Sequence, residues 1–187
     1  LPDASAASDP YVLMQVSQAE AIWIAGGDQW DYVSGWRGAA LGDLLNEHVN
    51  IKGAPIGGTS AGMAILGGAY FSAENGTVTS AQALANPFHP NLTVESANFL
   101  NLPHLEDVIT DTHYDAPDRK GRHMAFLARL AQDNNRRFYG IACDEYTAVA
   151  IDESGMARVF GDYPSYDDIA YFLQVNCTEP FLPEDCS

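Results

Sequence analysis

Short apolar runs alternate with longer stretches of helical periodicity in the first third of the chain. Residues 21–25 form an apolar run that ends at a pair of glycines, which is typical of a buried parallel strand. Residues 29–49 carry apolar side chains at helical spacing, residues 54–56 predict a second short strand, and residues 60–66 predict a helix. This order predicts an α/β protein with a mainly parallel sheet and functional sites at the carboxyl ends of its strands.

The pattern is weaker in the middle of the chain and recovers towards its end. Residues 71–105 are rich in Asn, Pro, Ser and Thr and lack sustained periodicity, so we expect an excursion over the site with one strand at 77–79. A strand at 107–110 and a helix at 119–130 follow. Further strands are expected at residues 138–143, 148–151 and 157–160. No internal repeat or linker is evident, which indicates one domain.

Composition and charge limit the classes of partner. The chain has 187 residues, 47% hydrophobic and 11% aromatic, which is ample for a packed core. Its formal charge of −16, from 25 acidic and 9 basic side chains, argues against nucleic-acid binding because phosphate neutralisation needs Lys and Arg. The acidity suits a cationic substrate or partner, or an exported or salt-tolerant surface that keeps the protein in solution. No apolar run approaches the ~20 residues of a membrane span, so no membrane association is expected.

The three cysteines do not predict a disulfide scaffold or a zinc site. Cys177 and Cys186 could close a short loop in an oxidising compartment, which would leave Cys143 buried in an apolar strand. That bridge and a start without Met favour an extracellular or periplasmic location.

One glycine-rich segment carries the strongest chemical signal. Gly58-Thr59-Ser60-Ala61-Gly62 has the Gly-x-Ser-x-Gly pattern, follows a predicted strand and precedes apolar helix residues. A serine nucleophile presented on a sharp strand-to-helix turn needs small flanking residues, since larger side chains would clash with neighbouring strands. We therefore expect Ser60 to be the nucleophile of a serine hydrolase.

A serine nucleophile needs a base, and the histidines are the candidates. His113 follows a predicted strand and lies between Asp111 and Tyr114, whereas the other histidines fall in helix patterns or in the irregular excursion. His113 is therefore the predicted base. A carboxylate should orient its imidazole, and spacing does not decide between Glu74, Asp111 and Glu145.

The developing oxyanion needs preorganised backbone donors. Gly26-Gly27-Asp28-Gln29 ends the neighbouring predicted strand and is well placed to supply one, and the amide of Ala61, directly after the nucleophile, would supply a second. An ordinary strand-to-helix turn would have the same sequence features.

Four motifs together resemble a known peptidase family. They are Gly26-Gly27-Asp28-Gln29, Gly58-Thr59-Ser60-Ala61-Gly62, Asp111-Thr112-His113-Tyr114 with Arg119 and Arg122 after it, and Asp144-Glu145-Tyr146-Thr147-Ala148. Their order and spacing are similar to those of the cyanophycinases and their relatives in peptidase family S51, which includes the aspartyl dipeptidase called peptidase E. The resemblance covers roughly residues 10–160. It implies a class I glutamine-amidotransferase-like, flavodoxin-like sandwich that needs no metal or organic cofactor.

The resemblance also implies roles for individual residues. The family usually places the acid between serine and histidine, so Glu74 becomes the first choice to orient His113. Arg119 and Arg122 match basic residues that help to bind a substrate carboxylate, and Asp111, Thr112 and Glu145 are expected at the same site. Two departures put the substrate in doubt, because cyanophycinases commonly have glutamine where Thr112 stands and arginine where Pro117 stands.

The function implied is hydrolysis of β-aspartyl-linked peptide bonds of the β-Asp-Arg type through an acyl-enzyme, with a peptide or β-aspartyl polymer as substrate. The alternatives are an aspartyl dipeptidase acting as an exopeptidase and a catalytically silent binding or scaffold protein of the same fold. Such folds carry more strands before the glycine pair than this chain does. We therefore expect residues 1–187 to form a single α/β hydrolytic domain, the C-terminal portion of a larger fold. The chain would be a fragment or processed form, or a second copy or another polypeptide would complete the sheet.

Overall fold

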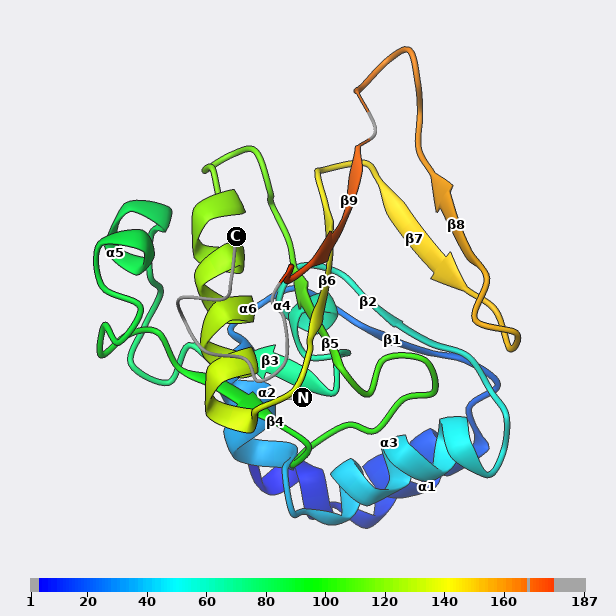
Figure 1. Ribbon diagram of the computed structural model, residues 1–187. Coiled ribbons are helices and arrows are strands. Elements are labelled where there is room, and N and C mark those ends of the chain that lie inside the picture. Colours follow the sequence, from blue (N-terminus) through cyan, green and yellow to red (C-terminus); the bar gives the residue numbers. More distant parts are fainter. Residues whose placement is uncertain (1–3, 168, 177–187) are drawn as a thin grey trace.

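The computed structural model describes residues 4–167 and 169–176. Its helices are η1 (Ala4–Ser8), α1 (Pro10–Gln18), α2 (Gln29–Trp36), α3 (Ala40–Asn50), α4 (Ala61–Ala64), α5 (Ser80–Ala85) and α6 (Lys120–Asn134). Its strands are β1 (Ile22–Ile24), β2 (Ile56–Gly58), β3 (Ala69–Phe71), β4 (Val94–Ser96), β5 (Val108–Asp111), β6 (Tyr139–Cys143), β7 (Ala148–Ile151), β8 (Ala157–Phe160) and β9 (Ala170–Gln174). Figure 1 shows β3, β5 and β6 in the middle of the molecule, with α5 and α6 on the left, α1 and α3 below, and β7 and β8 at the upper right.

The strands form one larger sheet and two pairs. The five-stranded sheet has the order β4-β3-β5-β6-β9, in which β3, β5 and β6 are parallel and the two edge strands run antiparallel to their neighbours. Strands β1 and β2 form a parallel pair, and β7 and β8 form an antiparallel hairpin. This α/β arrangement with parallel central strands confirms the predicted fold class.

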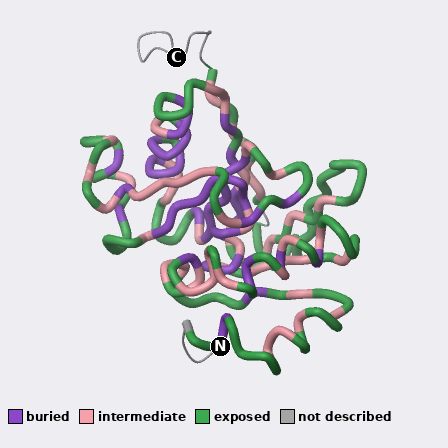
Figure 2. Tube along the Cα trace, turned by 90° about the horizontal axis from the view of Figure 1, so that it is seen from below, coloured by how far each residue is buried: buried purple, intermediate pink, exposed green. Residues whose placement is uncertain are grey.

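The core lies on both sides of the central strands. Phe71, Ile109, Phe126 and Phe138 are almost fully buried in a cluster between the sheet and α6. A second cluster packs β1 against α2, α4 and β3, and a third joins η1 and α3 to the loop before β5. Figure 2 shows these buried positions running through the middle of the molecule. Burial of these apolar side chains is the main favourable contribution to the free energy of folding. Their packing also holds in place the strand ends that carry the site.

Most of the predicted elements are confirmed. Strands β1, β2, β5, β6, β7 and β8 lie at or within about two residues of the predicted segments, and α6 begins one residue after its predicted start. Helix α6 continues to Asn134 because the left-handed conformation that ends it is adopted at Asn135, with φ of 49°. Cys143 is buried in β6, as the sequence suggested, and burial raises its pKa to about 11.

Some expectations are wrong. The single helix expected over residues 29–49 is two helices, because Gly38 adopts a φ of 72° that breaks the backbone pattern between them. Residues 77–79 are not a strand. They lead into α5, where the side chains of Thr79 and Gln82 form a capping box. The pattern also missed α1, β3, β4, α5 and β9.

The sequence also led to expectations about membrane association and about a disulfide bond. No helix in the described part of the chain is long and apolar enough to cross a bilayer. The proposed bridge between Cys177 and Cys186 lies outside the described residues.

Candidate active site

Ser60 lies on a strained turn between β2 and α4. Its φ of 54° and ψ of −118° are unusual for a residue with a side chain, and such conformations persist where the surrounding structure holds them. A Cβ on Gly58 would lie 2.3 Å from the carbonyl carbon of Gly62, and a Cβ on Gly62 would lie 2.1 Å from the carbonyl oxygen of Ile24. The two glycines therefore allow the close approach of β1, β2 and α4 that presents Ser60 at the strand ends.

Ser60 and His113 are 53 residues apart in sequence, and the fold brings them together. Ser60 Oγ lies 2.8 Å from His113 Nε2, and His113 Nδ1 lies 2.7 Å from Glu145 Oε1. His113 follows β5 and Glu145 follows β6, and these parallel strands pair with Asp111 opposite Ala142. Both side chains therefore leave the sheet at the same edge. A hydroxyl, an imidazole and a carboxylate in this order form the arrangement of a serine hydrolase triad.

The carboxylate on His113 differs from the first choice made from the sequence. Glu74 is exposed in the turn after β3, where its backbone N–H donates to Ser72 Oγ at 3.4 Å. Asp111 is 2% exposed and contacts arginine side chains instead. The expectation that Glu74 orients His113 is therefore wrong in this structure, and Glu145 holds that position.

The contact between His113 and Glu145 is accessible to solvent. The two side chains are 39% and 43% exposed. The hydrogen bond from His113 lowers the pKa of Glu145 below its ordinary value, and Arg119 acts in the same direction more weakly. Glu145 is therefore ionised at neutral pH and able to stabilise a positive imidazole.

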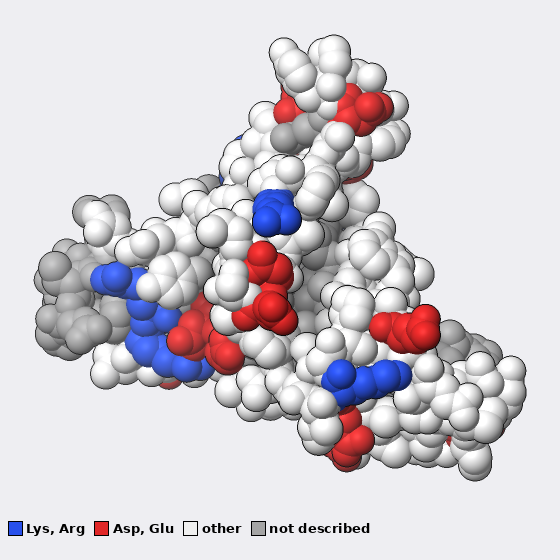
Figure 3. All heavy atoms as spheres, turned by 90° about the vertical axis from the view of Figure 1, so that its right-hand side faces the viewer, with Lys and Arg blue, Asp and Glu red and all other residues white. Residues whose placement is uncertain are grey.

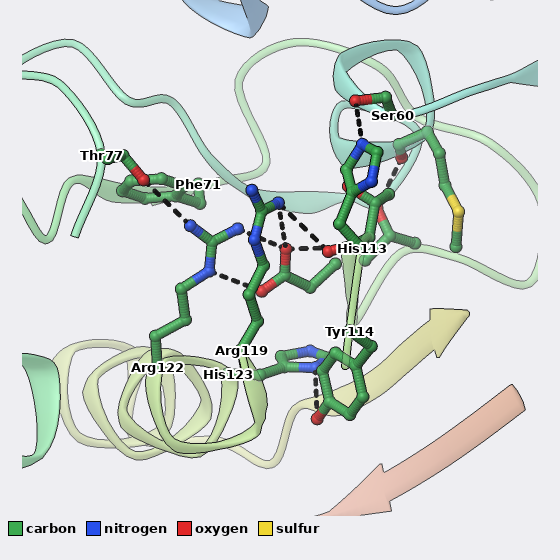
Figure 4. Close-up of polar contacts among 12 residues, drawn as sticks. Ser60, Phe71, Thr77, His113, Tyr114, Arg119, Arg122 and His123 are labelled. Carbon is green, nitrogen blue, oxygen red and sulfur yellow. Dashed lines mark hydrogen bonds and ion pairs between the residues drawn. The ribbon is translucent and has the colours of Figure 1, made fainter. Parts of the chain in front are cut away.

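Asp111 anchors a buried ion cluster beneath the site. Arg122 Nε donates to Asp111 Oδ2 at 2.8 Å and Arg122 Nη2 donates to Oδ1 at 2.6 Å, while Arg119 Nη1 lies 3.9 Å from Oδ1. Asp111 Oδ1 also accepts the backbone N–H of Thr112 at 2.9 Å. Figure 4 shows the side chains of Arg119 and Arg122 extending from α6 towards the region beside His113. The cluster holds the residues directly before His113 in place.

The two arginines differ in how much of their charge remains available. Arg122 is 4% exposed and also donates to Thr77 Oγ1 at 3.2 Å. Arg119 is 23% exposed at its side chain and donates to the backbone carbonyl of Thr112 at 3.1 Å. Burial and the neighbouring Arg122 lower the pKa of Arg119, although a guanidinium stays charged at neutral pH. Arg119 is therefore the cation that can receive an anionic group.

A cavity of about 280 Å³ opens beside Ser60. Its lining includes these residues expected from the sequence: Gly27, Asp28, Gln29, Ser60, Ala61, Thr112, His113, Arg119 and Arg122. Ala73, Gly76 and Thr77 line it as well and were not anticipated, because they lie in the stretch without periodicity. No sequence signal marks Thr77, whose hydroxyl accepts from Arg122. Cationic and polar groups thus surround one side of the serine.

The glycine pair after β1 lies directly beside Ser60. A Cβ on Gly26 would lie 3.2 Å from the Cβ of Ser60, so the backbone of this turn passes very close to Ser60. The Asp28 side chain accepts from the backbone N–H of Trp30 at 2.9 Å and caps α2, and Gln29 Nε2 donates to the carbonyl of Phe71 at 3.3 Å. Asp28 and Gln29 therefore shape the wall of the cavity as well as lining it.

Two other histidines that sequence reasoning set aside are structural. His123 is fully buried in α6, its Nδ1 lies 3.2 Å from the hydroxyl of Tyr114, and burial lowers its pKa, so it is neutral. His48 is 3% exposed in α3, with Nε2 3.1 Å from the carbonyl of Pro55. Neither contacts Ser60.

Charge is dispersed on the face drawn in Figure 3, where acidic side chains lie beside basic ones between large uncharged areas. The described residues contain no group of three or more His, Cys, Asp or Glu side chains placed to hold a metal ion.

Comparison with known proteins supports the assignment to a family. The model of peptidase family S51 matches residues 3–159. No curated protein sequence matches the chain. Among solved structures, the crystal structure of a peptidase from an acI-B1 Actinobacterium superposes with a TM-score of 0.58 at 17% sequence identity, covering 86% of this chain. At this identity the likeness concerns the fold, and the chain spans 57% of the length of that protein. The family match covers most of the sequence, and the chain belongs to peptidase family S51.

Proposed function

We propose that the chain is a serine-type peptidase that cleaves β-aspartyl-linked peptide bonds through an acyl-enzyme. The observation that carries this proposal is the continuous chain of contacts from Ser60 Oγ through His113 to Glu145 Oε1, at 2.8 and 2.7 Å, beside a cavity that contains Arg119. Membership of a peptidase family supports the reaction class.

The geometry supports the following mechanism. His113 Nε2 accepts the proton of Ser60 as Oγ attacks the carbonyl carbon of the scissile amide, and Glu145 stabilises the resulting imidazolium. The amide of Ala61, with a backbone N–H of the Gly26-Gly27 turn, would bind the oxyanion. The imidazolium then protonates the leaving amine. Water, activated by His113, hydrolyses the ester and releases Ser60.

Arg119 supports the choice of an aspartyl substrate. In a β-aspartyl linkage the side-chain carbonyl is attacked, and the α-carboxylate remains as a free anion close to the reacting carbon. Arg119 lines the same cavity as Ser60 and can pair with such an anion through two N–H donors. Arg122 holds Asp111 with two hydrogen bonds, so it supports the pocket from below. An arginine on the leaving group would suit the acidic chain, whose formal charge is −16.

The nucleophile is tested with a fluorophosphonate probe. We expect labelling at Ser60, located by peptide mass spectrometry, and no labelling of Ser60→Ala. A folded protein that is not labelled would support a catalytically silent protein of the same fold and contradict the proposal.

The orienting carboxylate is tested by a matched pair of variants. Glu145→Gln removes the charge that faces His113 and should lower the labelling rate by about 10²- to 10⁴-fold. Glu74→Gln makes the same change in an exposed turn and should stay within about twofold. A lower labelling rate in Glu74→Gln, together with a normal labelling rate in Glu145→Gln, would identify Glu74 as the orienting carboxylate instead.

The substrate is tested by comparing two classes of peptide. We expect hydrolysis of the β-Asp-Arg dipeptide to aspartate and free arginine, with Arg119→Lys raising KM because lysine cannot reproduce the two-donor contact. Hydrolysis of α-linked Asp-X dipeptides without cleavage of the β-Asp-Arg bond would instead identify an aspartyl dipeptidase.

A further inference from the structure

Glu145 lies at the base of a projecting arm. After β6 the chain leaves the five-stranded sheet, forms the β7–β8 hairpin and returns to the sheet as β9, next to the point where it left. Figure 1 shows the hairpin at the side of the molecule, and its turn contacts the body where His104 Nε2 lies 3.1 Å from the carbonyl oxygen of Glu153. Every residue of β7 and β8 is exposed or intermediate in burial. The packing of the arm therefore does little by itself to fix its base, where Glu145 contacts His113.

Two pairings across the base enclose Glu145. On the sheet side, the backbone N–H of Asp144 donates to the carbonyl of Ile169 at 3.1 Å, which extends the β6–β9 ladder by one step. On the arm side, the rings of Tyr146 and Tyr166 are stacked, with centroids 3.7 Å apart and planes 15° apart. Glu145 is thus the residue between the last backbone pairing and a side-chain stack that continues it.

The backbone conformation that carries the stack is energetically unfavourable, and burial of the two rings does not compensate for it. Tyr146 adopts a φ of 62°, a left-handed conformation that disfavours residues with a Cβ. Tyr146 and Tyr166 are also 65% and 44% exposed. The neighbouring Tyr146 raises the pKa of Tyr166 above its ordinary value. Contacts that hold a strained backbone next to a site residue point to a role in that site.

We propose that the Tyr146–Tyr166 stack is a positioning clasp that holds Glu145 against His113 Nδ1. Glu145 is itself 43% exposed at its side chain and has few packing contacts to restrict its rotamer. Fixing the backbone on both sides of Glu145 restricts where its carboxylate can reach. Tyr146 and Tyr166 therefore act through Glu145 and are not catalytic residues. The inference rests on the proposed role of Glu145 in a serine peptidase.

The test uses Tyr166→Ala, which removes the stack and leaves Tyr146 and the triad residues unchanged. The readout is the rate of Ser60 labelling by the fluorophosphonate probe, which requires no knowledge of the substrate. We expect the maximal labelling rate to fall roughly 3- to 10-fold, the range that loss of one aromatic pair allows, with an unchanged probe concentration for half-maximal labelling.

Three companion variants separate positioning from general damage to the fold. Tyr166→Phe keeps the stacked ring and should retain a rate within about twofold of the wild type. Tyr163→Ala makes the same truncation in the same turn at a residue that is 80% exposed, and it should change nothing. In a Glu145→Gln background, Tyr166→Ala should have no further effect.

Each other outcome overturns a specific statement. An equal loss from Tyr166→Ala with and without Glu145 would show that the stack does not act through Glu145. A changed half-maximal concentration at an unchanged maximal rate would show that the stack binds the ligand instead. If the probe labels Ser60 in Glu145→Gln at the wild-type rate, the proposed triad is contradicted. If Glu145→Gln is impaired and Tyr166→Ala is normal, the clasp alone is refuted.

Discussion

Asp111→Asn removes the negative charge that faces Arg119 and Arg122 beneath the active site. Asp111 is 2% exposed and Arg122 is 4% exposed, so water cannot replace the lost contact. The asparagine would retain one acceptor oxygen for Arg122 Nη2 and the Thr112 amide, which now lie 2.6 and 2.9 Å from Oδ1. Its NH₂ group would then face Arg122 Nε, a second donor, now 2.8 Å from Oδ2. The substitution leaves a buried guanidinium without a counter-charge.

The expected cost follows from that geometry. Breaking a buried ion pair by removing one partner destabilises proteins by ~3–5 kcal/mol, because the remaining charge is desolvated and unpaired. This is a large share of a typical unfolding free energy of ~5–15 kcal/mol. For a chain of this size it corresponds to a melting temperature lower by about 6–20 °C. Because Asp111 lies two residues before His113, labelling of Ser60 should decline as well.

Urea denaturation of both proteins measures the effect, with the m-value as a check that unfolding remains comparable. The matched control is Asp133→Asn, whose partner Arg129 lies 2.9 Å away, one turn earlier on α6, at an exposed site. It should cost less than ~1 kcal/mol. A loss below ~1 kcal/mol for Asp111→Asn at an unchanged m-value would refute the reasoning. The double variant Asp111→Leu/Arg122→Met should be more stable than Asp111→Asn, since it also removes the Arg122 charge, which is 4% exposed, and leaves only the partly exposed Arg119 without its carboxylate.

Further predictions concern the turn, the triad and the buried thiol. Gly62→Ala should lower the denaturation midpoint, because the new Cβ would lie 2.1 Å from the carbonyl oxygen of Ile24. Helix propensity alone favours alanine over glycine by ~1 kcal/mol. A higher midpoint would therefore contradict the close approach of Gly62 to β1. By NMR titration the pKa of Glu145 should lie below 4.5, and His113→Ala should raise it towards 4.5. Any stability from this exposed pair is present above about pH 4.5 and is lost as pH falls through the lowered pKa of Glu145. The pKa of Cys143 is about 11, so iodoacetamide at pH 8 should modify it only after unfolding, as read by peptide mass spectrometry.

Local signals in the sequence were sufficient to predict the elements that depend on steric constraints or on side-chain patterns within a few residues. The apolar runs predicted β1, β6, β7 and β8, and the glycines around Ser60 predicted a close-packed turn that the structure contains. The motif combination also identified the family, which the family model confirms. These features are encoded by neighbours along the chain, so a single sequence contains them.

Elements that depend on a distant partner were missed. Strand β4 has three residues and is defined by antiparallel pairing with β3, and β9 is defined by pairing with β6. Helix α5 has six residues and begins at a capping box. Segments this short carry too few periodic positions to distinguish a strand or a helix from a loop.

The site shows the same division between local and tertiary information. The sequence by itself determined that Ser60 sits on a glycine-flanked turn and that His113 follows a strand. It did not determine which carboxylate meets His113. Strand β6 pairs with β5 so that Asp111 lies opposite Ala142, and this register brings Glu145 beside a histidine 32 residues earlier. Glu74, which is closer to Ser60 along the chain, is turned into solvent after β3. The order of residues in the chain therefore specified Ser60 as the proposed nucleophile, whereas the pairing of strands brought Glu145 against His113.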